Sequence, residues 1–309
     1  MSAILDRIDQ RLLRETAGLH SIPRGAYNIR KNGVGIARES TANIEIRSKA
    51  DQSGIEVIVK PGTKNESVHI PVILSAEGFS DVVTNKFDIG EGSDVLVVAG
   101  CGVHNSGSAD SRHDGIHEFL IRRGARMRYV EKHYGEGQGK GKRILNPVTV
   151  INVEEGGVAE LELVQIRGVD STNRETRISL SRDARLIVTE RLLTNGEQDA
   201  VSRISVDLVG DDSTARVISR SVARDRSSQV FYFDLRGRSR CRGHVQCDSI
   251  IMDEAQVRSI PEISAHHCEA QLVHEAAIGR IAGEQLLKLM SLGLTREQAE
   301  STILDGFLK

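Results

Sequence analysis

Apolar and polar positions change their spacing twice along the chain, and each spacing predicts a different kind of element. At the start, apolar residues recur at helical spacing: Ile4, Leu5, Ile8, Leu12 and Leu13. This spacing predicts one amphipathic helix that ends near Gly18. From about residue 40, short runs such as 43–46 and 54–59 alternate apolar with polar positions, which is typical of half-buried strands.

The spacing becomes helical again after about residue 276. The apolar positions of this last segment are Ile281, Leu286, Leu287, Leu289 and Met290. Gly293 interrupts the pattern, and Thr295 is a good N-cap for a second helix from Arg296 to Leu308. We therefore predict a C-terminal helical hairpin. Its helices are too short to be stable alone in water, so they need a surface to pack on.

One phrase returns through the strand region: a polar or glycine turn, a small residue, and then alternating aliphatic residues. It stands at 91–100, 123–130, 155–166, 181–190, 210–219 and 253–260. A turn-plus-strand unit that recurs over most of a chain indicates a solenoid, whose coils bury their apolar faces by stacking. We predict a mainly β protein built as a parallel β-helix, with a β-sandwich or paired β domains as the alternative. The expected divisions are an N-terminal helix (1–25), a β-helix core (26–276) and a C-terminal helical segment (277–309).

Composition and charge argue against several classes of protein. Apolar residues make up 39% of the chain, enough for a substantial core, and a 3% aromatic content without tryptophan suits an interior of stacked aliphatic side chains. The net charge of −2 predicts neither nucleic-acid nor membrane-surface binding. The sequence has no signal-peptide pattern and no bilayer-spanning stretch, and its four cysteines lack the spacing of a disulfide framework. We expect a cytoplasmic protein with reduced thiols.

The segment from Gly243 to Leu294 holds the strongest group of metal-binding residue types. They are Cys247, His266, His267, Cys268, His274 and Glu275. In a solenoid these residues fall within two or three coils, so sulfur, imidazole and carboxylate ligands come close enough to place a metal. The alternative is that Cys247 fills the apolar core and the two adjacent histidines stay on a surface turn. The residues alone leave both interpretations open.

The same segment closely resembles the C-terminal core of the SufB/SufD family, which serves iron–sulfur cluster assembly. The shared features are the Cys-Asp-Ser strand at 247–249, Pro261, the His-Glu-Ala motif at 274–276, Arg280, Ile281, Gln285 and the final Gly-Phe-Leu at 306–308. The resemblance implies a right-handed parallel β-helix and a scaffold that holds a transient iron–sulfur cluster. It also implies that Cys247, His274 and Glu275 bind the nascent cluster. A thiolate both accepts sulfur and binds iron, which agrees with this assignment.

The resemblance implies partners as well. A separate SufC-type ABC ATPase supplies the energy and grips the helices of 277–309, so this chain is not itself an enzyme and binds no nucleotide directly. A cysteine desulfurase or free sulfide donates sulfur, and apo iron–sulfur proteins receive the product. The chain is expected to form a homodimer through its last coils, with Cys247, His274 and Glu275 of both copies at the interface.

A second cluster lies at 98–119, with Cys101, His104, His113 and His117 on what reads as a glycine- and serine-rich loop. By resemblance, Cys101 takes up sulfur, and Glu131 and His133 line its path. Where the family carries a functional lysine, this chain has Val150. The three histidines are either loop hydrogen-bonding groups or a further metal site. The same choice applies to His266, His267 and Cys268.

Several alternatives stay open. The nearest is a SufD-like structural or iron-acquiring subunit without its own cluster, and a Cys/His zinc protein is another. A polysaccharide-acting β-helix enzyme is disfavoured because tryptophan sugar platforms are absent. The run at 135–143 looks like a phosphate loop but lacks the Walker A spacing, and the His274-Glu275 pair lacks the second histidine of a zincin because position 278 is isoleucine.

Overall fold

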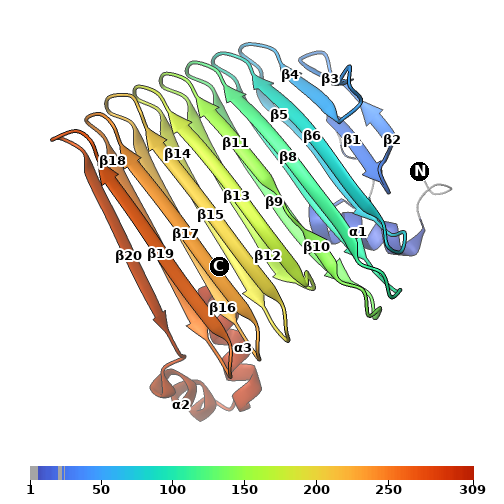
Figure 1. The fold of residues 1–309 in the computed structure, drawn as a ribbon, viewed down its shortest axis with the longest axis vertical. Coiled ribbons are helices and arrows are strands. Elements are labelled where there is room, and N and C mark those ends of the chain that lie inside the picture. The colour runs from blue at the N-terminus through green and yellow to red at the C-terminus, as the bar shows by residue number, and fades with distance from the viewer. Residues whose placement is uncertain (1–5, 20–22, 24) are drawn as a thin grey trace.

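Two large, mostly parallel sheets face each other through almost the whole chain, as the computed structural model shows for residues 6–19, 23 and 25–309 (Figure 1). Sheet A has the strand order β2 (Val34–Glu39), β1 (Ala26–Lys31), β5 (Lys64–Leu74), β7 (Asp94–His104), β9 (Arg126–Glu136), β12 (Val158–Arg167), β14 (Arg185–Thr194), β16 (Thr214–Ala223), β18 (Arg242–Ile251) and β20 (Gln271–Gly279). Sheet B has the order β19 (Gln256–Ala265), β17 (Ser228–Gly237), β15 (Asp199–Leu208), β13 (Ser171–Leu180), β10 (Arg143–Leu145) with β11 (Val148–Val153), β8 (Ser111–Ile121), β6 (Ser80–Ile89), β4 (Ile55–Val59) and β3 (Ile44–Ser48).

The chain places strands in the two sheets by turns and so winds a parallel β-solenoid of about eight turns. The predicted fold class is therefore confirmed, including the short N-terminal helix and the two C-terminal helices. Successive coils stack in register, as in the unbroken pairing of β16 with β18. Because side chains alternate between the two faces of a strand, residues in register form straight rows along the inside of the solenoid.

Most of these inner rows are apolar. One row of sheet B runs through Phe87, Phe119, Ile151, Ile178 and Val206, and all five side chains are buried. The rings of Phe87 and Phe119 stack with their centroids 4.3 Å apart. Rows of this kind bury aliphatic surface continuously from coil to coil, which is the main stabilising contribution in a solenoid.

The recurring turn of the sequence has a structural cause. At one end of the coils the turn residue has a positive φ angle, with glycine at Gly124 (φ 61°) and Gly156 (φ 66°) and aspartate at Asp183 (φ 56°). The N–H of each donates to a carbonyl oxygen of the next coil, at 2.9 to 3.0 Å. The first five phrases lead into strands of sheet A, whereas the sixth leads into β19 of sheet B. This difference makes the period of the phrases irregular.

Helix α1 (Arg7–Ala17) packs on the outer face of sheet A over β5, β7 and β9. It begins with a capping box at Asp6 and ends at Gly18, as the pattern predicts, while residues 1–5 lie outside the described residues. The side chains of Leu12 and Leu13 in this helix are buried. A Cβ atom at Gly100 would lie 2.7 Å from the carbonyl oxygen of Thr16, so the close approach of helix to strand requires glycine there.

The two C-terminal helices are α2 (Gly283–Ser291) and α3 (Arg296–Phe307), which follow β20 directly. Thr295 caps α3 as predicted. Arg220 of β16 donates to the carbonyl oxygen of Phe307 at 3.4 Å, which joins the end of α3 to sheet A. None of the residues of α2, all of which are described, is buried.

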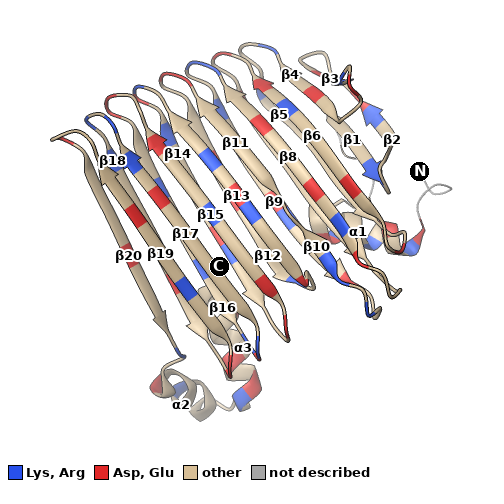
Figure 2. Cartoon of the chain, viewed as in Figure 1, with Lys and Arg blue, Asp and Glu red and all other residues tan. Residues whose placement is uncertain are grey.

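Charged residues of both signs are interspersed along the strands and turns (Figure 2). Neighbouring strands often carry opposite charges in register, as with Lys86 and Glu118, whose side chains lie 3.6 Å apart. Such pairs are exposed and contribute little stability individually. They do keep the outer faces polar.

Candidate functional site

Cys247 lies on β18 with its side chain inside the solenoid, where it is fully buried. Burial raises the pKa of its thiol to about 11. The hydroxyls of Ser259 and Ser249 act in the opposite direction, and the carboxylate of Glu190 raises the pKa further. The thiol is therefore protonated at neutral pH, and it needs a metal ion or a base before it acts as a ligand or nucleophile.

His274 of β20 also faces the inside. Its ring meets the ring of Phe233 edge-on, with the centroids 5.7 Å apart. Burial lowers the pKa of His274, and its Nε2 atom is buried without a hydrogen-bond partner. Cys247 pairs in register with Ala276, so the Cα atoms of Cys247 and His274 are separated by one strand spacing and two residues, or about 8 Å. A neutral imidazole and a thiol thus share one inner surface.

Glu275 lies on the other face of the same strand. Its side chain is exposed, and its Oε2 atom lies 3.5 Å from Nε2 of His244. The strand alternation therefore separates Glu275 from Cys247 and His274 within one chain. Among the described residues, no group of three or more His, Cys, Asp or Glu side chains is arranged to hold a metal ion.

The last coil has open edges. In the described part of the chain, β20 pairs only with β18 and β19 only with β17. Ile263 of β19 and Ile278 of β20 are each 42% exposed. The solenoid therefore ends in unpaired backbone N–H and C=O groups with exposed apolar side chains beside them, and another strand could pair with these groups.

The turn that joins β19 and β20 holds the remaining C-terminal candidates, His266, His267 and Cys268. All three side chains are exposed. Nδ1 of His267 accepts a hydrogen bond from the N–H of Glu269 at 3.2 Å, which is a local turn contact.

The second predicted cluster forms an interior chamber. Cys101 of β7, His113 and His117 of β8, and Glu131 and His133 of β9 are buried and line a cavity of ≈ 20 Å³. Cys101 and His133 are in register on adjacent strands. This volume holds about one water molecule.

The predicted loop at 98–119 is wrong in its secondary structure. Most of it belongs to β7 and β8, and the connection between them covers only 105–110. Polar residues such as His113 and His117 occupy inward positions of β8, so the usual alternation of apolar and polar residues in a strand is absent there. His104 stays apart from the chamber, because its Nδ1 lies 3.2 Å from Oε1 of Glu136.

Burial shifts the pKa values of the side chains that line this chamber. It raises the pKa of Cys101 well above its ordinary value, to which Asp81 and Glu131 also contribute. It lowers the pKa of His117 to about 4. For Glu131, burial alone would raise the pKa, but Arg174 and His133 outweigh it, so the pKa lies well below its usual range. A neutral thiol and a neutral imidazole thus stand beside a charged carboxylate.

A buried charged network extends from the chamber towards Cys247, and sequence reasoning identified only its members Glu131 and His133. Arg174 of β13, 4% exposed, pairs with Glu131 and lies 3.9 Å from Glu190 of β14. The carboxylate of Glu190 accepts hydrogen bonds from Ser202 at 2.6 Å and from Ser219 at 2.7 Å. Ser219 is the in-register neighbour of Cys247.

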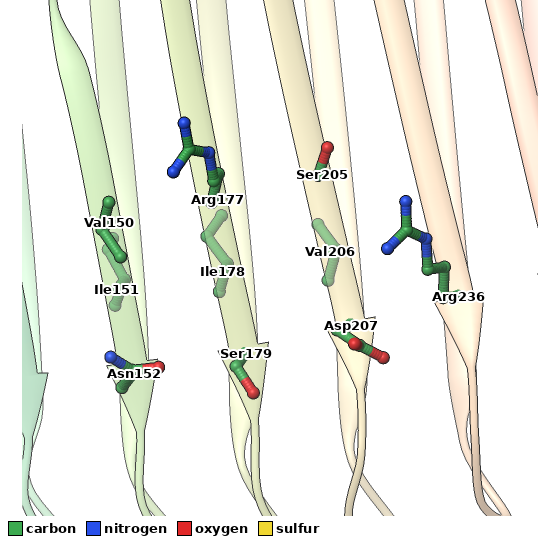
Figure 3. A pocket seen from close by; sticks show the side chains of 10 residues that line it. All are labelled: Val150, Ile151, Asn152, Arg177, Ile178, Ser179, Ser205, Val206, Asp207 and Arg236. Carbon is green, nitrogen blue, oxygen red and sulfur yellow. The ribbon is translucent and has the colours of Figure 1, made fainter.

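Val150 does not belong to this interior. It lies on the outer face of sheet B, in a depression of ≈ 390 Å³ formed by β11, β13, β15 and β17 (Figure 3). The residues that line this depression include Arg177, Asp207 and Arg236 but neither cysteine nor histidine. The buried guanidinium of Arg174 lies on β13, the strand next to β11.

Comparison with known proteins decides the family. Residues 72–307 match the family described as "SUF system FeS cluster assembly, SufBD core domain". This chain belongs to the SufBD family. Membership implies a role in iron–sulfur cluster assembly, and the SufBD match spans the solenoid from the first parallel coils to α3.

Several relatives of this SufBD chain are named as iron–sulfur cluster assembly SufBD family proteins. One from Archaeoglobus fulgidus is 28% identical over 263 residues, which cover 84% of this chain and 69% of the relative. One from Methanothermobacter thermautotrophicus is 27% identical over 274 residues, or 87% of this chain and 65% of the relative. One from Methanocaldococcus jannaschii is 26% identical over 256 residues, which cover 82% of this chain and 80% of the relative. The chain thus covers about two thirds of the length of the first two.

Neither α1 nor the C-terminal pair, nor any other described helix, has the length and apolar character needed to cross a bilayer.

Proposed function

We propose that this chain is a scaffold on which an iron–sulfur cluster is assembled, with Cys247 as its central thiol. The observation that carries the proposal is that Cys247 of β18 and His274 of β20 face the same inner surface at the open end of the solenoid. His274 brings a buried Nε2 atom that has no hydrogen-bond partner. A neutral imidazole and a thiol that loses its proton to iron are suitable ligands for this metal.

We propose that the complete site forms between two copies of the chain. One chain places two donors inside and Glu275 outside, so further ligands have to come from a second copy. The open edges of β19 and β20 offer unpaired backbone groups on which a symmetry-related edge can dock. Light scattering at micromolar concentration tests this: a dimer is expected, and a monomer both with and without the ATPase contradicts the shared site.

The sulfur route in this proposal follows the inner polar network. Cys101 receives sulfur, and Glu131, His133, Arg174 and Glu190 line the way to Ser219 beside Cys247. Cys101 and Cys247 are separated by five strand spacings of sheet A, or about 24 Å. The sulfur comes from a cysteine desulfurase or from sulfide, and apo iron–sulfur proteins receive the product.

The C-terminal helices are the proposed contact for a separate SufC-type ABC ATPase. On the segment after β20, Leu287 is 67% exposed and Leu292 is 72% exposed. Large apolar side chains left in water favour a protein partner. In this proposal, ATP-driven movement of the partner pulls on α2 and α3 and opens the last coils, so that the buried thiol of Cys247 becomes accessible.

Anaerobic reconstitution with ferrous iron and sulfide tests the central thiol. The Cys247→Ala variant is expected to lose most of the visible cluster absorption and the transfer to an apo acceptor. The matched control is Cys241→Ala, which removes another buried thiol of the same core. Full absorption and transfer with Cys247→Ala rules out this residue as the cluster thiol.

A SufD-like role without an own cluster is the second candidate. The complete burial of Cys247 and its raised pKa favour it, because an inert core cysteine has the same properties. In that case neither the wild type nor the variants bind a cluster, whether or not the ATPase is present.

A further inference from the structure

The N-terminal end of the solenoid contains a second cavity, which the functions above do not use. Its volume is ≈ 260 Å³, and it lies among β1 to β6. It is lined by Asn28, Arg30, Gly35, Arg38, Ser48, Gln52, Gly54, Ile55, Ile70, Val72, Val83 and Asn85. We call this cavity the mouth. The charged residues of its lining are Arg30 and Arg38. Arg30 is paired with Asp81, so the uncompensated charge that favours an anion is that of Arg38.

Arg38 stands at the rim of the mouth with its side chain exposed. Its Nε donates to Oδ1 of Asn28 at 2.9 Å, and its Nη1 donates to the hydroxyl of Ser48 at 3.0 Å. Within the described ranges, no ion pair joins Arg38 to a carboxylate. The guanidinium is therefore held in place by neutral groups and keeps its full positive charge for a ligand.

The mouth leads towards the chamber of Cys101. Ile70 and Val72 line both cavities. Between them, Arg30 donates two hydrogen bonds to Asp81, at 2.9 and 2.8 Å. Nδ1 of His113, which lines the chamber, lies 3.3 Å from the same carboxylate. A polar partition of three side chains thus separates the exposed cavity from the buried thiol.

We propose that the mouth binds a small inorganic anion and that hydrosulfide is the one that passes to the chamber of Cys101. The identity of the ion as sulfide rests on the proposed function, whereas anion binding itself rests on the arginine lining alone. The size of the chamber selects the ion, because ≈ 20 Å³ holds a species about as large as water. Sulfate, phosphate and thiosulfate fit the mouth but not the chamber.

The burial of Cys101 supports free sulfide as the donor. Its side chain is 4% exposed and lies behind the partition, so a persulfide on another protein does not reach it in this conformation. The proposal covers binding and passage of the anion only. It includes no sulfur–sulfur bond, because forming one from a thiol and hydrosulfide requires an oxidant.

Crystals soaked in bromide test the anion site without any cluster chemistry. We expect an anomalous peak in the mouth of the wild type, beside Arg38, and its loss in Arg38→Met. The matched control is Arg47→Met, since Arg47 is an exposed arginine of the neighbouring β3 that pairs with Glu56 at 2.8 Å. A mouth without bromide in the wild type, or an undiminished peak in Arg38→Met, overturns the proposal.

Cluster reconstitution at varied sulfide concentration tests the passage. For Arg38→Met we expect the half-saturating sulfide concentration to rise about tenfold, the loss of one charged contact, with the maximal rate unchanged. Gly35→Phe is designed to block the mouth with a large side chain. The fold tolerates a side chain at this position, because a Cβ atom there would meet only Asn28 Oδ1, at 4.0 Å. Gly35→Phe should slow reconstitution at low sulfide, whereas Arg47→Met should not.

The two experiments separate the two proposals. If the wild type binds bromide in the mouth but builds no cluster, the proposed function fails and the anion site stands. If clusters form with unchanged sulfide dependence in both mouth variants, the scaffold function stands and passage through the mouth is wrong.

Discussion

The two ends of the solenoid are finished in different ways. At the N-terminal end, antiparallel hairpins of β1 with β2 and β3 with β4 terminate both sheets, and α1 covers sheet A beside them. At the C-terminal end, β19 and β20 are ordinary parallel strands, and within the described residues each has one unpaired edge. The outer edges of β2 and β3 are also unpaired there, but these strands belong to antiparallel hairpins, whereas β19 and β20 continue the parallel stack and leave edges on which another strand can add. This difference supports the proposed interface between two copies at the C-terminal end.

Two of the three buried thiols, Cys101 and Cys247, lie near opposite ends of the solenoid. Cys101, near the first end, shares its chamber with a charged carboxylate and histidines. Cys247, near the open end, is surrounded by hydroxyls and lies close to His274. The surroundings of Cys101 contain buried charges of this chain, whereas the proposed ligand set at Cys247 needs further ligands from a second copy. Variants in each end therefore should differ in what they disturb.

The largest effect is expected from Arg174→Met in the buried network. Removing the guanidinium leaves Glu131 and Glu190 buried without their counter-charge, so the free energy of unfolding should fall by about 3–5 kcal/mol. The control is Arg177→Met on the same strand, whose partner Glu175 is largely solvated, with an expected loss of about 0.5 kcal/mol or less. Chemical denaturation at pH 7 measures both. Equal losses would show that Arg174 is not balancing buried charge.

The next largest effect is a pH dependence at the N-terminal chamber. The pKa of folded His117 is about 4, below the unfolded value of about 6.5. The unfolded chain therefore binds an extra proton between these values, and stability should fall by about 3 kcal/mol as the pH drops from 6.5 to 4. Denaturation across this range should show the slope in the wild type and a flatter curve in His117→Gln. An identical slope in the variant would assign it to other groups.

Glu131 adds a second phase at lower pH. Because its folded pKa is depressed, its contribution is present above the unfolded value and is lost as the pH falls through the folded one.

A smaller effect is expected where α1 docks. Gly100→Ala forces a Cβ atom against Thr16, which should cost about 1–3 kcal/mol and loosen the helix. Gly279→Ala at the open end meets nothing within 4 Å, so it should change stability by less than about 0.5 kcal/mol. Thermal melts of the two variants compare a packed end with an open one. A larger loss for Gly279→Ala would reverse the comparison.

The smallest effect on stability, but a large one on association, is expected from Ile278→Lys. The residue is exposed on β20, so the free energy of unfolding should stay within about 0.5 kcal/mol. A charge on this edge should nevertheless disrupt self-association, as sedimentation velocity would show. Val34→Lys on β2, 62% exposed at the other end, is the control that should leave association unchanged.

The architecture could be predicted well from the sequence, because each coil of the solenoid repeats a similar pattern of turn and strand residues. Turn residues with positive φ and alternating aliphatic residues recur in almost every coil, and Thr295 and Gly293 mark the last helix. Each of these signals is local, so neighbouring residues alone reveal it. The prediction from alternation failed at 98–119, where the imidazoles of His113 and His117 occupy inward positions.

The site was less accessible to sequence reasoning. Strand alternation places adjacent residues on opposite faces, so the pair His274 and Glu275 is divided between inside and outside. Arg174 stands in a strand rich in polar residues, and no local pattern marks it as buried, because its two carboxylate partners come from other strands. Contacts across coils depend on register, which the sequence does not encode locally.

In-register stacking also sets a unit of length for this architecture. Each coil touches only the coils on either side, so adding or removing a whole coil between the chamber and the open end leaves both ends intact. The separation of the two thiols would then change in steps of about 4.8 Å rather than continuously. A change in the number of coils would therefore alter the distance between Cys101 and Cys247 only by whole strand spacings.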